Sequence, residues 1–154
     1  MKMKYIALSG LSLIVLGACG PSESTDEKTL VVDNVSASVE QIADARLAAV
    51  MVYADWCGSC KVLDPRINAI RENNQFDQTA FITLDYTSKN KEAFYAAAQA
   101  YGVDNAVKDY LGQKVKTGQL LLVDLDDKRV VSVIKKDMDD QDIIFMIKDE
   151  AEKA

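Results

Sequence analysis

The sequence predicts an α/β domain in which helices cover both faces of a mixed central sheet. Three observations support this fold class. Apolar runs with the character of buried strands alternate with segments of helical periodicity along most of the chain. Two strand-like runs near the C-terminus are separated only by residues 126–128, as in an antiparallel hairpin. The length of 154 residues and the apolar share of 49% fit one compact domain. The predicted element order is β-α-β-α-β-α-β-β-α.

The first predicted elements are a strand, a helix and a second strand. The segment TLVVD, residues 29–33, has the composition of a short strand. Ser38 followed by Gln41 fits a capping box, which predicts a short helix through about Arg46. The run LAAVMVY, residues 47–53, is continuously apolar, as expected of a strand buried on both faces.

The middle of the chain adds two helices around a third strand. From Cys57 to about Asn73, apolar side chains recur every three or four positions, which predicts an amphipathic helix whose first residue is Cys57. The segment AFITLDY, residues 80–86, is the next predicted strand. A second helical stripe follows and stops at Gly102. Its members are Phe94, Ala97, Ala98 and Tyr101.

The C-terminal part is predicted to form the hairpin and a last helix. Its two strands are QLLLVDL and RVVSVIK, residues 119–125 and 129–135. Asp137 or Asp139 is placed to cap the helix that follows. The apolar side of that helix consists of Ile143, Met146, Ile147 and Ala151.

The N-terminal segment has the pattern of an export signal. Lys2 and Lys4 precede a mostly apolar stretch, residues 6–16, which is shorter than the roughly 20 residues of a lasting membrane span. The signal ends in LGAC, which resembles the lipobox of bacterial lipoproteins. The resemblance implies that residues 1–18 are a signal peptide that is removed, and that Cys19 is lipidated. The alternative is an ordinary leader or an uncleaved anchor, with Cys19 incidental.

This layout predicts a folded domain on a membrane tether. Residues 19–28 are almost entirely polar and are expected to stay disordered, and the domain covers residues 29–154. The protein would be extracytoplasmic, lipid-anchored to a bacterial membrane, on the periplasmic side in a Gram-negative organism. Lipid on Cys19 would leave an even pair of cysteines, which suits an oxidising compartment. The net charge of −6 argues against a nucleic-acid partner.

The remaining cysteines, Cys57 and Cys60, are placed for thiol-disulfide chemistry. Both sulfurs fall within one helical turn, and the unpaired amides of a helix N-terminus favour a thiolate at Cys57. Cys60, one turn inside on the apolar face, is shielded. Cys57 can attack a partner disulfide, and Cys60 can then displace the mixed disulfide; the reverse sequence donates a disulfide. Gly58 and Ser59 permit the partner's tight approach, and Trp56 supplies a rigid apolar flank.

The motif WCGSCK, followed by Pro65, resembles the active site and kinked second helix of the thioredoxin family. The predicted element order agrees with that family from about Thr29 onward. The resemblance implies a thioredoxin-like three-layer sandwich and a thiol-disulfide oxidoreductase that acts on cysteine-containing extracytoplasmic proteins and needs a redox partner. Cys57 would be the attacking cysteine, Cys60 the resolving one and Trp56 a shielding aromatic. No cofactor is implied.

Two departures from the family pattern concern the surroundings of the cysteines. The family has a buried aspartate six residues before the first cysteine, as proton acceptor for the resolving thiol, and this chain has Met51 there. The family's cis-proline beside the active site is also missing. In its place we expect Thr117, Gly118 and Gln119 to form the substrate-binding loop that faces the cysteine pair. The long connection before it, residues 102–118, has room for an added helical turn.

Other uses of the cysteine pair are less well supported. A structural disulfide usually closes a longer loop, where the stabilisation is larger. A metal site is disfavoured because the chain has no histidine, and the same absence excludes a Cys-His nucleophile. The alternative to an enzyme is a binding module of the same fold whose cysteine pair is structural or regulatory.

Overall fold

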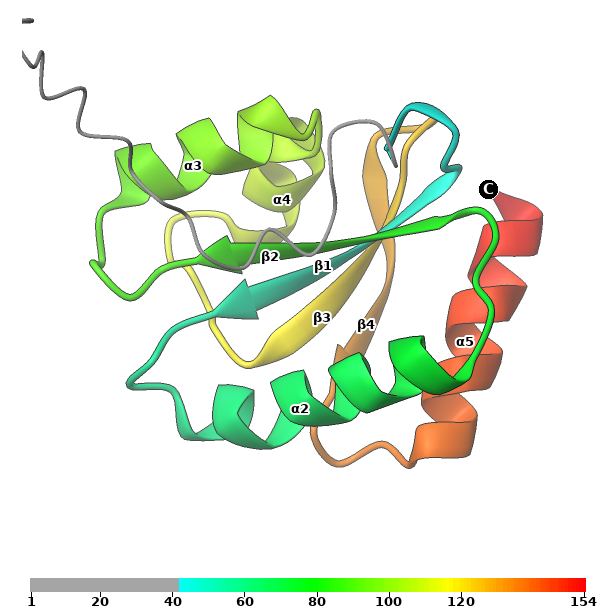
Figure 1. Ribbon diagram of the computed structural model, residues 1–154. Helices are drawn as coiled ribbons and strands as arrows, with labels where there is room; N and C mark the ends of the chain where they lie inside the picture. The colour runs from blue at the N-terminus through cyan, green and yellow to red at the C-terminus, as the bar shows by residue number, and fades with distance from the viewer. Residues whose placement is uncertain (1–41) are drawn as a thin grey trace, which may run out of the picture. The chain divides into compact units, whose positions relative to one another are not determined.

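The computed structural model describes residues 42–154 (Figure 1). The predicted signal peptide, tether and strand at residues 29–33 lie outside the described residues, as does the start of the first predicted helix. The described end of that helix comes at Ala43 and not near Arg46. The reason is that Arg46 already donates its N–H to the carbonyl of Gln78, at 3.0 Å, where the sheet begins.

Within the described residues, four strands form one mixed sheet in the order β2-β1-β3-β4. Their bounds are β1 Leu47–Tyr53, β2 Thr79–Asp85, β3 Gln119–Asp124 and β4 Arg129–Lys135. β1 pairs parallel with β2 and antiparallel with β3, and β3 and β4 form the predicted antiparallel hairpin. β1 lies between two other strands, and all of its residues except Tyr53 are buried, which agrees with its continuous apolar run.

Helices cover both faces of this sheet, as predicted (Figure 1). The helices are α2 Gly58–Asn73 and α5 Asp140–Lys153 on one face, and α3 Lys91–Ala100 and α4 Asp104–Leu111 on the other. Side chains of β1 alternate between the two faces. Ala49 and Met51 join the core under α2 and α5, whereas Val50 and Val52 join the core under α3 and α4. The predicted α/β class is therefore confirmed, with the sheet as the middle of three layers.

The helix α2 carries the cysteine pair and is amphipathic as predicted. Its buried residues are Cys60, Leu63, Ile67 and Ile70. Cys57 is the N-cap and not the first helical residue, because its backbone is extended, with φ −87° and ψ 109°. Pro65 lies inside the helix, eight residues after this cap.

Three details differ from the sequence prediction or sharpen it. The connection before β3 holds a complete eight-residue helix, α4, and not merely an added turn, because Ala106, Val107 and Leu111 give it an apolar face that the sheet can bury. Ala97 is exposed, since α3 faces the core through Phe94 and Ala98. Of the two aspartates proposed to cap α5, Asp139 does so.

No helix among residues 42–154 combines the length and apolarity needed to cross a bilayer.

Candidate active site

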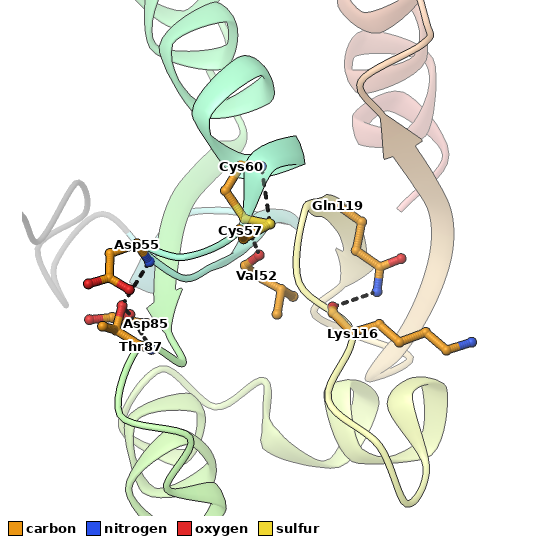
Figure 2. Close-up of a disulfide and its surroundings, with 8 residues drawn as sticks. All are labelled: Val52, Asp55, Cys57, Cys60, Asp85, Thr87, Lys116 and Gln119. Carbon is orange, nitrogen blue, oxygen red and sulfur yellow. Dashed lines mark hydrogen bonds between the residues drawn. A yellow bond between two sulfur atoms is a disulfide. The ribbon is translucent and has the colours of Figure 1, made fainter.

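Cys57 and Cys60 form a disulfide at the N-terminus of α2, with their Cα atoms 5.3 Å apart (Figure 2). The Cys57 sulfur accepts a hydrogen bond from the Cys60 N–H at 3.2 Å. This is the interaction expected of an N-cap, with sulfur in place of the usual oxygen. In the reduced protein the same N–H and the helix dipole would stabilise a thiolate on Cys57.

The two sulfurs differ in their access to solvent. Cys57 keeps 7% of its surface exposed, whereas Cys60 is completely buried. A partner disulfide can therefore reach Cys57 first, and Cys60 can act only on a sulfur that is already bonded to Cys57. This asymmetry is the one that the amphipathic pattern of α2 predicts.

The carbonyl oxygen of Val52 on β1 contacts both the cysteine pair and the loop before β3. It accepts the N–H of Gly118 at 2.8 Å, and the Cys60 sulfur lies 3.6 Å away from it (Figure 2). Cys60 carries no proton in the disulfide, so this contact becomes an S–H···O hydrogen bond only when the pair is reduced. In the reduced protein the Val52 carbonyl can thus accept a hydrogen bond from the Cys60 thiol, but it is too weak a base to remove the proton.

Gly118 brings the loop before β3 against the cysteine pair. A Cβ atom at this position would lie 2.6 Å from Ser59 Cβ and 3.1 Å from the Cys57 sulfur. The glycine also has φ +83°, which side chains disfavour. Of the predicted loop residues, Gly118 therefore lies next to Cys57, and Thr117 beside it is half-buried. Within residues 42–154 there is no cis peptide bond, so the loop reaches the site without one.

Gln119 has a different orientation from the one expected of a substrate contact. Its Nε2 donates to the carbonyl of Lys116 at 3.1 Å, and Gln119 is only 6% exposed. Figure 2 shows the amide turned back toward its own loop. Gln119 therefore fixes the shape of the loop that carries Gly118.

The side chain of Trp56, next to Cys57 in the chain, is hydrogen-bonded to the loop after β2. The sequence alone did not point to this loop. The indole Nε1 of Trp56 donates to the carbonyl of Thr87 at 3.0 Å, and the N–H of Asp55 donates to Thr87 Oγ1 at 3.0 Å. Asp85 in turn accepts the N–H of Thr87 at 2.7 Å and also its hydroxyl. The Asp-x-Thr pattern at the end of a predicted strand is the sequence signal for such a turn. Trp56 remains 48% exposed.

Residues 42–154 contain no cluster of three or more histidine, cysteine, aspartate or glutamate side chains that could hold an ion. Met51, at the position of the family's buried aspartate, is 2% exposed and belongs to the same apolar cluster as Cys60.

Comparisons with known proteins agree with this geometry. A family model described as Thioredoxin matches residues 28–116. The chain is 26% identical over 108 residues to "Thioredoxin F1, chloroplastic" of Arabidopsis thaliana, a match that covers 58% of this chain and 60% of that protein. It is 36% identical over 63 residues to "Thioredoxin-2, mitochondrial" of Schizosaccharomyces pombe, covering 41% of this chain and 42% of that protein. The chain thus spans less than two thirds of the length of each relative.

Among solved structures, a mutant thioredoxin from Halobacterium salinarum is similar, with 24% sequence identity and a TM-score of 0.45. That match covers 73% of this chain and 80% of the other.

Proposed function

Because the chain belongs to the thioredoxin family, whose model matches residues 28–116, we propose that it is a thiol-disulfide oxidoreductase acting on cysteine-containing proteins. One observation carries the proposal. The Cys57 sulfur caps α2 and accepts the Cys60 N–H, while Cys60 is buried one turn deeper. This arrangement gives one cysteine the role of nucleophile and the other the role of resolving thiol.

The reaction uses both cysteines in turn. The Cys57 thiolate attacks one sulfur of a partner disulfide, and the other partner sulfur leaves as a thiolate. The Cys60 thiolate then attacks the Cys57 sulfur, which forms the intramolecular disulfide and releases the second partner thiolate. The partner disulfide gains two electrons, and the Cys57–Cys60 pair loses two. In the opposite direction the same steps donate a disulfide to a partner dithiol, and a separate redox partner restores the starting state.

The surface around Cys57 is proposed to bind the partner chain. Trp56 and Gly58, which flank Cys57 in the chain, are exposed. The loop at Gly118 approaches both Ser59 and the Cys57 sulfur. The close approach of Gly118 leaves no side chain of its own between the loop and the sulfur. Thr117 is proposed to complete this surface, and Gln119 to fix the loop through its hydrogen bond to the Lys116 carbonyl.

We further propose that the protein acts outside the cytoplasm on a lipid anchor at Cys19. The support is in the sequence: a charged start, an apolar middle and the LGAC motif in the order of a lipoprotein signal. Mass spectrometry of the mature N-terminus tests this directly. The expected species begins at a lipid-modified Cys19, and an unmodified Cys19 or an intact residue 1 would contradict it.

Replacing each cysteine tests the oxidoreductase proposal. With a small disulfide-containing protein as substrate and dithiothreitol as reductant, Cys57→Ser should abolish turnover. Cys60→Ser should instead accumulate a mixed disulfide with the substrate, visible on a non-reducing gel. If Cys57→Ser left turnover intact, the pair would be structural or regulatory, and the binding-module alternative would replace the enzyme.

A further inference from the structure

Lys89 places a positive charge over Trp56, the exposed aromatic residue that precedes Cys57. The Lys89 Nζ lies 5.1 Å from the centre of the Trp56 ring. This is within the distance of about 6 Å at which a cation is attracted to the face of an aromatic ring. The indole is itself fixed by its hydrogen bond to the Thr87 carbonyl. The ammonium group therefore has a defined place on the surface that is proposed to bind the partner chain.

The backbone of the loop after β2 is unusual at Lys89. This residue has φ +57°, in the left-handed region that residues with side chains seldom adopt. Its N–H donates to the carbonyl of Tyr86 at 3.0 Å, which closes the turn after β2. Strained backbone is concentrated at functional sites, where the surrounding structure holds it in place. In this loop the strained residue is the one whose side chain reaches Trp56.

The charge of Lys89 is not neutralised by an acidic side chain of the described part of the chain. Lys89 is exposed and forms no ion pair within residues 42–154. Two aspartates, Asp55 and Asp85, belong to the same part of the site. Asp85 accepts the N–H and the hydroxyl of Thr87, so its carboxylate is already used within the turn. The Lys89 ammonium group is therefore available to a carboxylate of a partner.

The loop before β3 brings further lysines to the cysteine pair. Lys91 Nζ donates to the carbonyl of Gln113 at 2.7 Å, which joins this loop to the start of α3. The loop then runs to Gly118, next to the disulfide. Lys114 and Lys116 lie between these two points and are exposed. Figure 2 shows the Lys116 side chain directed away from the disulfide, so it would meet a partner farther from the reacting sulfur.

The segments around the cysteine pair differ in charge from the rest of the chain. Residues 54–61, 85–91 and 112–118 together contain five lysines and two aspartates, a net charge of +3. The whole chain has a net charge of −6, so the remaining residues carry −9. Complementary charge orients two proteins as they approach, and like charge disfavours the wrong orientation. This distribution favours an acidic partner surface that arrives at Cys57.

We propose that the preferred partners are proteins whose reacting disulfide is flanked by aspartate or glutamate, and that Lys89 recognises the acidic side chain. The inference rests on the proposed function, because it names the partners of that same reaction. A partner carboxylate contacts the Lys89 ammonium group while the partner chain packs on Trp56. The steps at Cys57 and Cys60 are unchanged. Lys89 determines which disulfides reach them.

Disulfide-containing peptides that differ only in the residues beside their cysteines test this inference. One peptide carries glutamate there, the second lysine and the third glutamine. Each is mixed in excess with the reduced protein at low ionic strength, the reaction is quenched with acid, and the oxidised protein is quantified by mass spectrometry. Each rate is divided by the rate of 2-mercaptoethanol with the same peptide, which removes differences in the intrinsic reactivity of the disulfides.

The wild type should react about three- to tenfold faster with the glutamate peptide than with the lysine peptide, and high salt should reduce this preference. Lys89→Glu should lower the glutamate-to-lysine ratio by about tenfold, and Lys89→Gln by less, because exposed charge pairs each contribute modestly. The glutamine peptide should keep about the same rate in all variants. Lys128→Glu is the matched control and should keep the wild-type ratio. Lys128 is exposed and has φ +52°, and it lies in the turn between β3 and β4, at the opposite end of β3 from Gly118.

Three results would overturn the assignment of Lys89. These are a wild type without preference for the glutamate peptide, an unchanged ratio in Lys89→Glu, and a ratio that Lys128→Glu lowers as much as Lys89→Glu does. The last result would mean that only the net charge of the protein matters. A wild type that is oxidised by none of the three peptides overturns the proposed function instead, so the two failures are distinguishable.

Discussion

Replacing Gly118 with alanine is expected to disturb both the fold and the reaction, because a methyl group there would enter the space next to Cys57. The new Cβ would lie 2.6 Å from Ser59 Cβ and 3.1 Å from the Cys57 sulfur. Ser59 Cβ is fixed to the first turn of α2 and cannot rotate away, so either the loop or the start of the helix must move.

The size of the effect follows from two contributions. Alanine at φ +83° costs about 1–2 kcal/mol of backbone strain. Overpacking against Ser59 and Cys57 adds about 1–3 kcal/mol. Gly102→Ala is the matched control, because Gly102 has φ +69° but nothing within 4 Å of the position of its Cβ. That control should show the strain alone.

Denaturant unfolding of the oxidised proteins measures the stability difference. Access to Cys57 is measured with a chromogenic aryl disulfide, which releases a first coloured thiolate when Cys57 of the reduced protein attacks it, and the rate of this first phase is the readout. Gly118→Ala should be the less stable of the two variants by about 1–3 kcal/mol. It should also react more slowly in the first phase, whereas Gly102→Ala should react like the wild type. If both variants lost the same stability and both reacted normally, the loop would not pack against Cys57, and the proposed substrate surface would be wrong.

Three further predictions concern single residues of the domain. Thr87→Val removes the Oγ1 acceptor of the Asp55 N–H, so it should slow the first phase and lower the fluorescence anisotropy of Trp56, the only tryptophan. An unchanged anisotropy would count against this role of Thr87. Asp64→Asn should raise the melting temperature at neutral pH, because burial raises the folded-state pKa of the Asp64 carboxyl and the ionised side chain therefore opposes folding. This gain in melting temperature should vanish below the unfolded-state pKa, where both states are protonated. Arg66→Ala should lower the free energy of unfolding by about 1–3 kcal/mol, because the Arg66 guanidinium donates to the carbonyls of Lys136 and Met138 and to the Asp140 carboxylate, and so joins α2 to the start of α5. Urea unfolding at high salt should show most of the same loss, because salt screens the ion pair with Asp140 but not the two hydrogen bonds to carbonyls that the wild type makes.

The sequence was sufficient for the features that depend on local pattern. The continuous apolar run of β1 predicted a strand buried on both faces, and the two strand-like runs predicted the β3–β4 hairpin. The three- and four-residue spacing on α2 predicted which cysteine would be the more deeply buried. In each case the property is set within one element, by the period of the backbone.

Features that depend on contacts between distant segments could not be predicted. The helix α4 is short, and it is stabilised by the burial of its apolar residues against the rest of the domain, which the local sequence does not reveal. The support of Trp56 by Thr87 joins positions 31 residues apart. The approach of Gly118 to Cys57 was expected from the family resemblance and not from the loop sequence itself.

The proposed mechanism requires that the start of α2 makes Cys57 a thiolate nucleophile while it buries Cys60. The most direct measurement is the pH dependence of alkylation of the reduced protein by iodoacetamide, with each cysteine quantified by peptide mass spectrometry. We expect Cys57 to be alkylated at pH values where a model thiol hardly reacts, and Cys60 to stay unmodified. Alkylation of Cys57 with the profile of a model thiol, or of Cys60 as fast as Cys57, would contradict it.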